Sequence, residues 1–185
     1  MKRFSIIISI LLVCGLMINK ISAQEMESSS KGNSASLIAQ LAADDLQGSS
    51  KKIIALAEAV PAEDYNWRPE EGVRSVAEVY VHIGMSNYFI LSFLGEKMPQ
   101  GFDQNAEKNM TDKKDIINFL KQSFDDAQKF LSDYSDTDYD TIVELPFGKF
   151  SKKQILMLTA THAHEHLGQS IAYARTNHIV PPWSK

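Results

Sequence analysis

Four stretches of the chain place apolar residues at steps of three and four, the pattern of an amphipathic helix. They cover residues 34–61, 75–95, 111–133 and 151–176. Polar or aromatic loops separate them, including a polar segment over residues 99–109. The pattern therefore predicts four long helices. In the first stretch the repeating positions are Leu37, Leu41, Leu46, Ile53, Ile54, Leu56 and Ala57.

The second and fourth stretches begin with a capping box, in which a Ser is followed three residues later by Glu or Gln. These pairs are Ser75 with Glu78 and Ser151 with Gln154. Just before the fourth stretch, residues 141–145 are rich in β-branched side chains, and Pro-Phe-Gly follows as a turn signal. The fold class is therefore predicted as all-α: an up-and-down four-helix bundle with a short strand-like excursion before the last helix.

The N-terminus has the composition of a secretory signal peptide over residues 1–23. A short basic start leads into an apolar run from Phe4 to Ile18, and small residues precede a cleavage point after Ala23. An uncleaved membrane anchor is the alternative, although the run is short for a span. A Ser- and Glu-rich tether at 24–33 then leads to a domain at 34–185. We expect export to the periplasm or the extracellular space, with no stable membrane insertion after cleavage.

Charge and cysteine content narrow the possible functions. The formal net charge is −4, and removing 1–23 takes away Lys2, Arg3 and Lys20 with no acid, which leaves −7. An acidic domain is not expected to bind the phosphates of a nucleic acid. The single cysteine, Cys14, lies inside the signal peptide. Any metal site must therefore use His, Asp, Glu or backbone groups.

The fourth stretch contains the residues best suited to metal chemistry. His162 and His166 are separated by four positions, so a helix places both imidazoles on one face. His82, on the apolar stripe of the second stretch, is the expected third ligand. Three imidazoles suit zinc, nickel, iron or copper rather than magnesium or calcium, and they leave a position open for water. His164 points away from this face, and His178 follows the helix end.

A structural reading of these residues remains open, because a buried histidine is often only a hydrogen-bonded core residue. Glu165 does not create the zinc-protease motif, since Ala163 occupies the position where that motif needs Glu. We interpret Tyr80 and Tyr88 as core residues. Gln169 is expected to hydrogen-bond a ligand imidazole or a neighbouring helix, and Arg175 to stabilise a helix C-terminus.

The chain resembles the DinB-like (DinB/YfiT) superfamily of metal-binding four-helix bundles. The resemblance lies in Trp67-Arg68-Pro69, the segment from Ser75 to Ile83, the segment from His162 to Gln169, and Pro181-Pro182. It covers about residues 34–183. It implies a divalent metal site at His82, His162 and His166, and in many members a homodimer.

The resemblance also suggests what this protein does. Relatives include metal-dependent hydrolases, thiol-dependent S-transferases and a maleylpyruvate isomerase, so whether this chain is an enzyme stays open. The leading hypothesis is a hydrolase acting on a small molecule through a metal-activated water. A thiol-dependent S-transferase is the second, although low-molecular-weight thiols are chiefly cytoplasmic and the chain carries an export signal. A non-catalytic metal-binding or stress-related bundle is the third.

Overall fold

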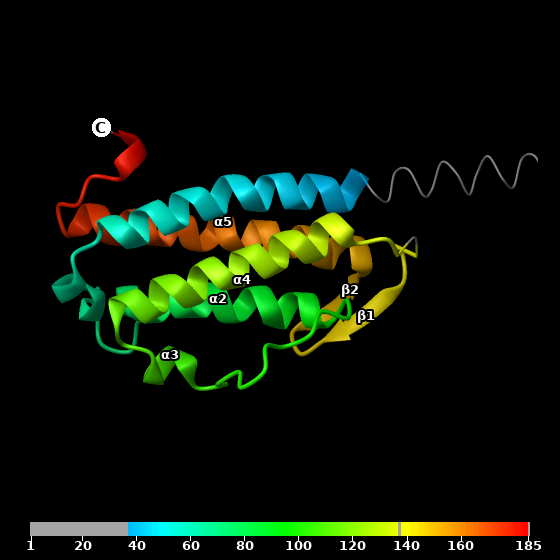
Figure 1. The fold of residues 1–185 in the computed structure, drawn as a ribbon, viewed down its shortest axis with the longest axis horizontal. Helices are drawn as coiled ribbons and strands as arrows, with labels where there is room; N and C mark the ends of the chain where they lie inside the picture. Colours follow the sequence, from blue (N-terminus) through cyan, green and yellow to red (C-terminus); the bar gives the residue numbers. More distant parts are fainter. Residues whose placement is uncertain (1–36, 137, 185) are drawn as a thin grey trace, which may run out of the picture.

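The computed structural model describes residues 37–136 and 138–184, and its dominant feature is a bundle of four long helices (Figure 1). They are an N-terminal helix described over residues 37–59, α2 (Val76–Ser92), α4 (Lys113–Asp133) and α5 (Lys152–Thr176). The predicted four-helix bundle is confirmed. The predicted signal peptide at 1–23 and tether at 24–33 lie outside the described residues. The shorter elements are η1 (Ala62–Asn66), α3 (Ala106–Asn109), β1 (Ile142–Leu145), β2 (Gly148–Ser151) and η2 (Pro182–Ser184).

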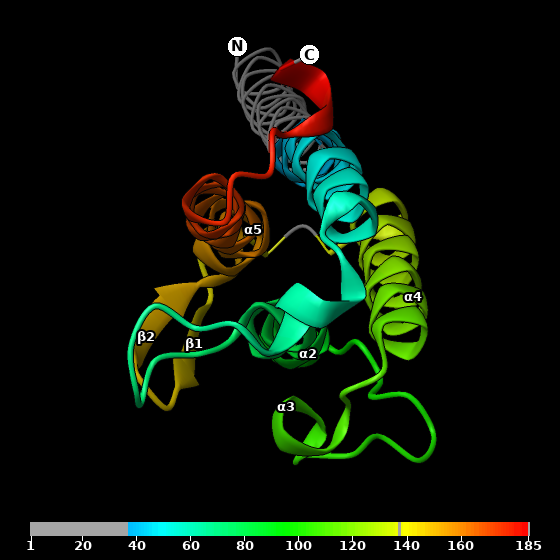
Figure 2. The same cartoon turned by 90° about the vertical axis from the view of Figure 1, so that its left-hand side faces the viewer.

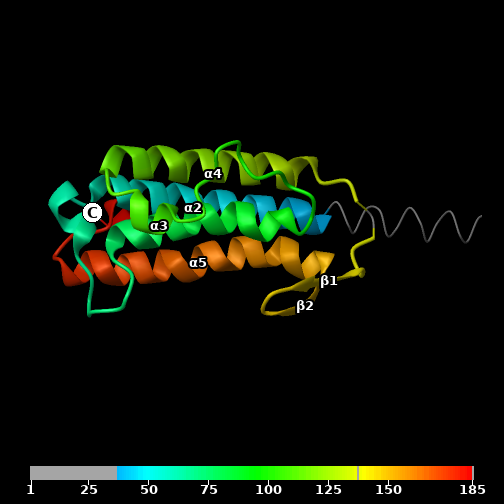
Figure 3. The ribbon, with the colours of Figure 1, turned by 90° about the horizontal axis from the view of Figure 1, so that it is seen from below.

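Seen along its axis, the bundle has α2 beside both α4 and α5, and the N-terminal helix lies across from α2 (Figure 2). The long helices α2 and α4, with only the short α3 between them in the chain, run in the same direction, as the colours of Figure 1 and Figure 3 show. The bundle therefore departs from the predicted up-and-down order at this pair of helices. This is possible because residues 93–112 run back along the bundle before α4 begins. The segment carries α3 to a position beside α2, which becomes important for the site.

The helix starts follow the sequence signals. The Ser75 side chain accepts a hydrogen bond from the Glu78 backbone N–H, and the Glu78 carboxylate accepts one from the Ser75 N–H at 2.7 Å. At the start of α5, Gln154 accepts from the Ser151 N–H at 2.8 Å. Asp112 caps α4 by accepting from the backbone of its first turn. These contacts satisfy N–H groups that have no partner inside a helix.

The predicted excursion before the last helix is a two-stranded antiparallel hairpin. Strand β1 pairs with β2, and Leu145 lies opposite Gly148 across a tight turn. Gly148 has a φ of 151°, a backbone conformation that other residues rarely adopt. The sequence predicted β1 and the turn. It did not predict β2, because Gly148–Ser151 has little strand character by itself.

The core runs along the bundle axis, and on the N-terminal helix it begins in the first turn. Ala39, Ala42 and Leu46 are buried there, whereas Leu37 and Leu41 are 55% and 52% exposed. The periodic pattern therefore identified the helix, but it assigned two of these leucines to a face that is not the buried one. Within the described residues, no helix is long and apolar enough to cross a membrane.

Candidate metal centre

Three histidines from two adjacent helices meet between α2 and α5. One potential ligand atom from each of His82, His162 and His166 lies within 4.8 Å of the others. The ring centroids are 5.3 Å apart for His82 and His162, 4.8 Å for His82 and His166, and 4.5 Å for His162 and His166. His82 comes from the middle of α2 and the other two from successive turns of α5. The predicted convergence of the three side chains is therefore present in the structure.

His82 is oriented by an acid from α3. Its Nδ1 lies 2.7 Å from Glu107 Oε1, and the second oxygen of Glu107 accepts from Arg74 Nε at 2.9 Å. Burial alone would raise the pKa of Glu107, but the hydrogen bonds from Arg74 and His82 outweigh it and lower that pKa. The carboxylate is thus ionised and can only accept, so His82 Nδ1 carries the proton. The lone pair of His82 is then on Nε2, the atom that can bind a metal, and the Ser86 hydroxyl lies 3.4 Å from it.

His166 is oriented by a chain of hydrogen bonds that ends on a backbone carbonyl. Tyr173 donates its hydroxyl proton to the Arg74 carbonyl at 3.2 Å and accepts from Gln169 Nε2 at 3.0 Å. Gln169 therefore turns its Oε1 toward His166 Nδ1, 2.8 Å away. A carbonyl can only accept, so the whole chain has one consistent direction, and His166 Nδ1 is the donor. Nε2 of His166 keeps its lone pair.

His162 has no comparable partner. Its Nδ1 is buried and makes no hydrogen bond in the structure. Burial first, and then the neighbouring His166, His82 and Arg74, lower the pKa of His162 to about 3. Burial also lowers the pKa of His82, and the hydrogen bond to Glu107 offsets this in part. Both imidazoles are therefore neutral at neutral pH, the form that binds a metal.

These residues fit a divalent transition metal. A buried ring nitrogen without a hydrogen-bond partner is costly unless something binds it. Two of the three rings are oriented from outside through Nδ1, as is usual for metal-ligating histidines. Three neutral nitrogen donors suit zinc and its neighbours and do not suit magnesium or calcium. Zinc–nitrogen bonds are about 2.0–2.1 Å long, so ligand nitrogens on one ion lie closer together than 4.8 Å. Small rotations of the rings bring the three nitrogens to that separation.

Comparison with known proteins places the chain in a family. The model of the DinB superfamily matches residues 35–170. The chain belongs to the DinB superfamily. No match was found among curated proteins.

Solved DinB structures share the fold at low sequence identity. A DinB-like protein from Bacillus cereus is 21% identical, with a TM-score of 0.62 and 75% of this chain and 93% of that chain covered. YfiT from Bacillus subtilis is 13% identical, with a TM-score of 0.60 and coverage of 77% and 89%. Its description is a probable metal-dependent hydrolase with an unusual four-helix bundle topology. A conserved protein from Enterococcus faecalis is 15% identical, with a TM-score of 0.59 and coverage of 74% and 94%.

In this DinB bundle, the other histidines lie away from the three. His164 Nε2 is 3.0 Å from Asp45 of the N-terminal helix, on an exposed face. His178 is exposed directly after α5, with a φ of 60°. The predictions that both residues stand apart from the metal-binding face are confirmed. Glu78 completes its capping box, as expected.

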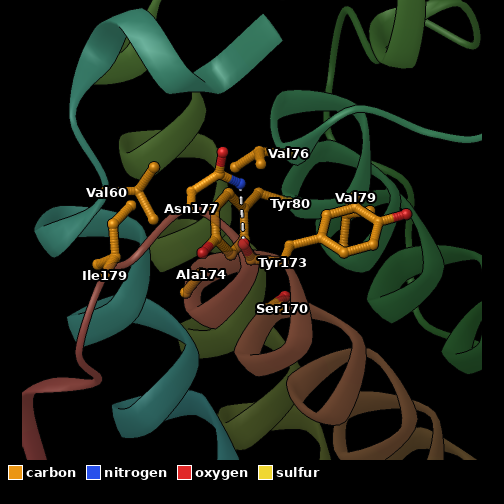
Figure 4. Close-up of a pocket in the computed structure, with 9 residues that line it drawn as sticks. All are labelled: Val60, Val76, Val79, Tyr80, Ser170, Tyr173, Ala174, Asn177 and Ile179. Atoms are coloured by element: carbon orange, nitrogen blue, oxygen red, sulfur yellow. Dashed lines mark hydrogen bonds between the residues drawn. The ribbon is translucent and has the colours of Figure 1, made fainter. Parts of the chain in front are cut away.

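The tyrosines predicted to be core residues are buried. Tyr80 and Tyr88 are 1% and 3% exposed. Tyr80 lines a small cavity between α2 and α5, together with Ser170 and Asn177 (Figure 4). The volume of this cavity is about 10 Å³, enough for at most one water molecule, so the cavity is not a substrate site.

The sequence did not identify the residues that orient the ligands on the α3 side. Glu107 lies in the segment predicted as a polar loop, and Arg74 lies just before the capping box of α2. No periodicity or motif marks either residue, because their role depends on how residues 93–112 fold back. Gln169 was expected to hydrogen-bond a ligand imidazole or a neighbouring helix, and the structure shows it in contact with the imidazole of His166.

A larger cavity opens beside His82 and Glu107. It lies between α2 and the segment that leads back to α3, and its volume is about 400 Å³. This is within the size range of small-molecule sites. The lining residues are His82, Met85, Ser86, Phe89, Met98, Phe102, Gln104 and Glu107.

Proposed function

We propose that the chain is a metal-dependent hydrolase in which His82, His162 and His166 hold one divalent transition metal ion: zinc, nickel or iron. The observation that carries the proposal is the arrangement of the three rings. Their potential ligand atoms lie together, while Nδ1 of His82 and of His166 is held by other residues. Such a set of three protein ligands leaves a position for water or substrate.

When bound, such an ion activates water and polarises a carbonyl or phosphoryl oxygen. The chain's own residues keep the site in the form that can bind it. Glu107 and Gln169 fix the protons of His82 and His166 on Nδ1. Ser86 offers a neutral hydroxyl 3.4 Å from His82 Nε2, on the side of the larger cavity, where it can hydrogen-bond water or substrate.

Two further observations support hydrolysis over a purely structural metal. The cavity beside His82 gives a small molecule access to the site. YfiT, which shares the fold, is described as a probable metal-dependent hydrolase. A structural zinc site, by contrast, is usually closed by a fourth protein ligand.

The first experiment measures metal content by mass spectrometry in untagged protein, with His162→Ala as the test and His164→Ala as the matched control. We expect one metal ion per chain in the wild type and in His164→Ala, and none in His162→Ala, with circular dichroism unchanged in all three. A wild type that takes up no metal even after reconstitution would end the proposal. Unfolding of His162→Ala together with metal loss would support a structural metal instead.

The second experiment measures turnover of a panel of esters, amides and thiol conjugates by the metal-loaded protein. Hydrolysis of an ester or amide that disappears in His162→Ala and persists in His164→Ala supports the proposal. Transfer that requires an added thiol, without hydrolysis, would assign the chain to the S-transferases. No turnover of any substrate by protein that is fully loaded with metal would favour the non-catalytic bundle.

We also propose that the protein is exported to the periplasm or outside the cell and forms a homodimer. The support is the signal-like composition of residues 1–23 and the resemblance to dimeric relatives. Expression of the full chain followed by cell fractionation and N-terminal sequencing tests export, and a mature protein beginning at Gln24 is the expected result. Light scattering during gel filtration tests the dimer.

A further inference from the structure

We infer that the cavity beside His82 binds a neutral, apolar group of the substrate, an alkyl chain or an aromatic ring next to the bond that is cleaved. This inference deepens the proposed function and rests on it for the reaction, but the binding of the apolar group can be tested without turnover. The first argument is composition. Met85, Phe89, Met98 and Phe102 supply most of the lining, whereas the neutral polar side chains are only Ser86 and Gln104.

The second argument is charge. The one acid in the lining is Glu107, and both of its oxygens are already used, by His82 and by Arg74. The lining contains no Lys or Arg. A charged substrate group would therefore lose its hydration in this cavity without gaining a counter-ion, which is costly. A neutral apolar group gains free energy from the same transfer.

The third argument is exposure. Phe89 and Met98 both line the cavity and are each 40% exposed, one on α2 and one on the returning segment. Apolar side chains that remain exposed around a concave site mark a place where a ligand covers them. Met side chains also adapt to the shape of a ligand, because they are unbranched and flexible.

Position assigns this cavity to the substrate. His82 and Glu107 form part of its wall, so a group seated among the Met and Phe side chains has its neighbouring atoms beside His82, one of the three clustered histidines. A second apolar groove, of about 370 Å³, lies between the N-terminal helix and α5 and includes Met157. None of the three histidines lines that groove, so it provides a control surface with similar chemistry.

The test is calorimetric titration with straight-chain alkyl hydroxamic acids, from acetohydroxamic to octanohydroxamic acid. The hydroxamate group binds a metal, and the alkyl chain reports on the cavity. We expect affinity to rise about fourfold per methylene until the cavity is filled. The heat-capacity change should become more negative as the chain lengthens. An affinity independent of chain length would overturn the inference.

Two pairs of variants locate the effect. Met98→Gln and Phe89→Ser change the cavity, and we expect the rise per methylene to fall to about twofold or less because each variant removes apolar contact. The matched controls are Met157→Gln and Phe147→Ser, at positions 38% and 57% exposed and outside this cavity. These controls should keep the wild-type increase in affinity per methylene. Equal losses in cavity and control variants would overturn the inference.

The metal-free variant His162→Ala separates this inference from the proposed function. We expect weaker binding of every hydroxamate but the same rise per methylene, because His162 does not line the cavity. If loading with metal does not increase the affinity for any hydroxamate, the metal proposal fails. The increase in affinity per methylene can still support an apolar site in that case. If metal strengthens all of them equally and chain length has no effect, the metal proposal survives and the apolar site is rejected.

Discussion

Helix α2 packs against α4 on one side and α5 on the other, and polar side chains lie between the helices in both places. Between α2 and α4, Asn87 donates to Ser123 Oγ at 3.1 Å, and Ser123 donates to the Leu120 carbonyl at 2.8 Å. Between α2 and α5, His82, His162 and His166 face one another. Glu107 holds Nδ1 of His82, and Gln169 holds Nδ1 of His166. The Ser86 hydroxyl lies 3.4 Å from His82 Nε2, and His162 Nδ1 has no hydrogen-bond partner.

The difference separates a structural polar contact from a binding site. The amide and hydroxyl groups between α2 and α4 satisfy each other, so that interface is complete without a ligand. The imidazoles between α2 and α5 include one buried nitrogen without a partner, His162 Nδ1. Buried polar atoms in native proteins are nearly always hydrogen-bonded, so this atom points to a missing partner. The proposed partner is a metal ion, because three imidazoles from two helices meet there.

The largest expected effect is on metal affinity at the histidines between α2 and α5. Glu107→Ala removes the acceptor, on α3, that orients His82. We expect metal affinity to fall about 10- to 100-fold, the range found when the partner of a ligand histidine is removed. Competition titration with a fluorescent chelator measures the change. Glu165→Ala is the control, because Glu165 is exposed on α5. The metal affinity of this variant should match that of the wild type. An unchanged affinity in Glu107→Ala would show that Glu107 does not support the site.

The next effect is a loss of stability of the metal-free protein below neutral pH. The folded pKa of His162 is lowered to about 3, mainly by burial, so the unfolded chain takes up a proton that the folded chain refuses. Stability therefore decreases as pH falls below about 6.5, by up to about 1.4 kcal/mol per pH unit for each such histidine. His82 contributes in the same direction. Unfolded Glu side chains are half protonated at about pH 4.3 and take up few protons above about pH 5.5, so the window from about pH 6.5 to about pH 5.5 reports mainly on the histidines.

Urea unfolding across this window measures the slope. His162→Gln cannot take up the proton and should flatten the slope, whereas His178→Gln, an exposed change, should leave it as in the wild type. An equal slope in wild type and His162→Gln would assign the acid sensitivity to other groups.

The sequence predicted the clustering of the three histidines because they lie on regular helices. His162 and His166 lie four residues apart on a helix, and the capping box at Ser75 sets the start of the helix that carries His82. Helical periodicity then suffices to place the rings on inward faces. The identification of Gln169 as a partner of a ligand imidazole worked for the same reason, since it is three residues after His166.

The remaining parts depend on contacts that no local pattern encodes. Glu107 reaches His82 only because residues 93–112 run back along α2, and the apolar cavity is formed by the same return. Strand β2 acquires its conformation from pairing with β1, since Gly148 and Lys149 have low strand preference. The exposure of Leu37 and Leu41 likewise depends on which face of the N-terminal helix packs against the bundle, since Ala39 and Ala42 in the same turns are buried. In each case the information lies in the tertiary arrangement.

A smaller effect is expected at the α2–α4 interface, where Gly84 allows close packing. A Cβ at position 84 would lie 2.5 Å from the Phe119 ring. Gly84→Ala should cost about 1–3 kcal/mol of unfolding free energy through overpacking, reduced by up to about 1 kcal/mol of helix propensity. Urea unfolding measures this. The double variant Gly84→Ala with Phe119→Leu should recover part of the loss, and both proteins should bind metal like the wild type. A gain in stability for Gly84→Ala would show that Phe119 moves aside freely.

The smallest expected effect is on metal affinity, and it is tested by removing one tyrosine hydroxyl on each side of α2. Tyr173→Phe removes the group that fixes Gln169, while Tyr88→Phe removes a hydroxyl that donates to Asp126 of α4 at 2.7 Å. Tyr173→Phe loses two hydrogen bonds of about 0.5–1.5 kcal/mol each, and Tyr88→Phe loses one to a carboxylate, about 1.5–3 kcal/mol. Only the first change is connected to one of the clustered imidazoles. We expect Tyr173→Phe to weaken metal binding about two- to tenfold, since Gln169 can then rotate and His166 is no longer held with its proton on Nδ1. Nitrogen-15 NMR of the histidine rings in the metal-free protein reports this as a shift in the tautomer ratio of His166. Tyr88→Phe should change neither quantity, and a similar loss of metal affinity in both variants would mean that the two interfaces are not functionally distinct.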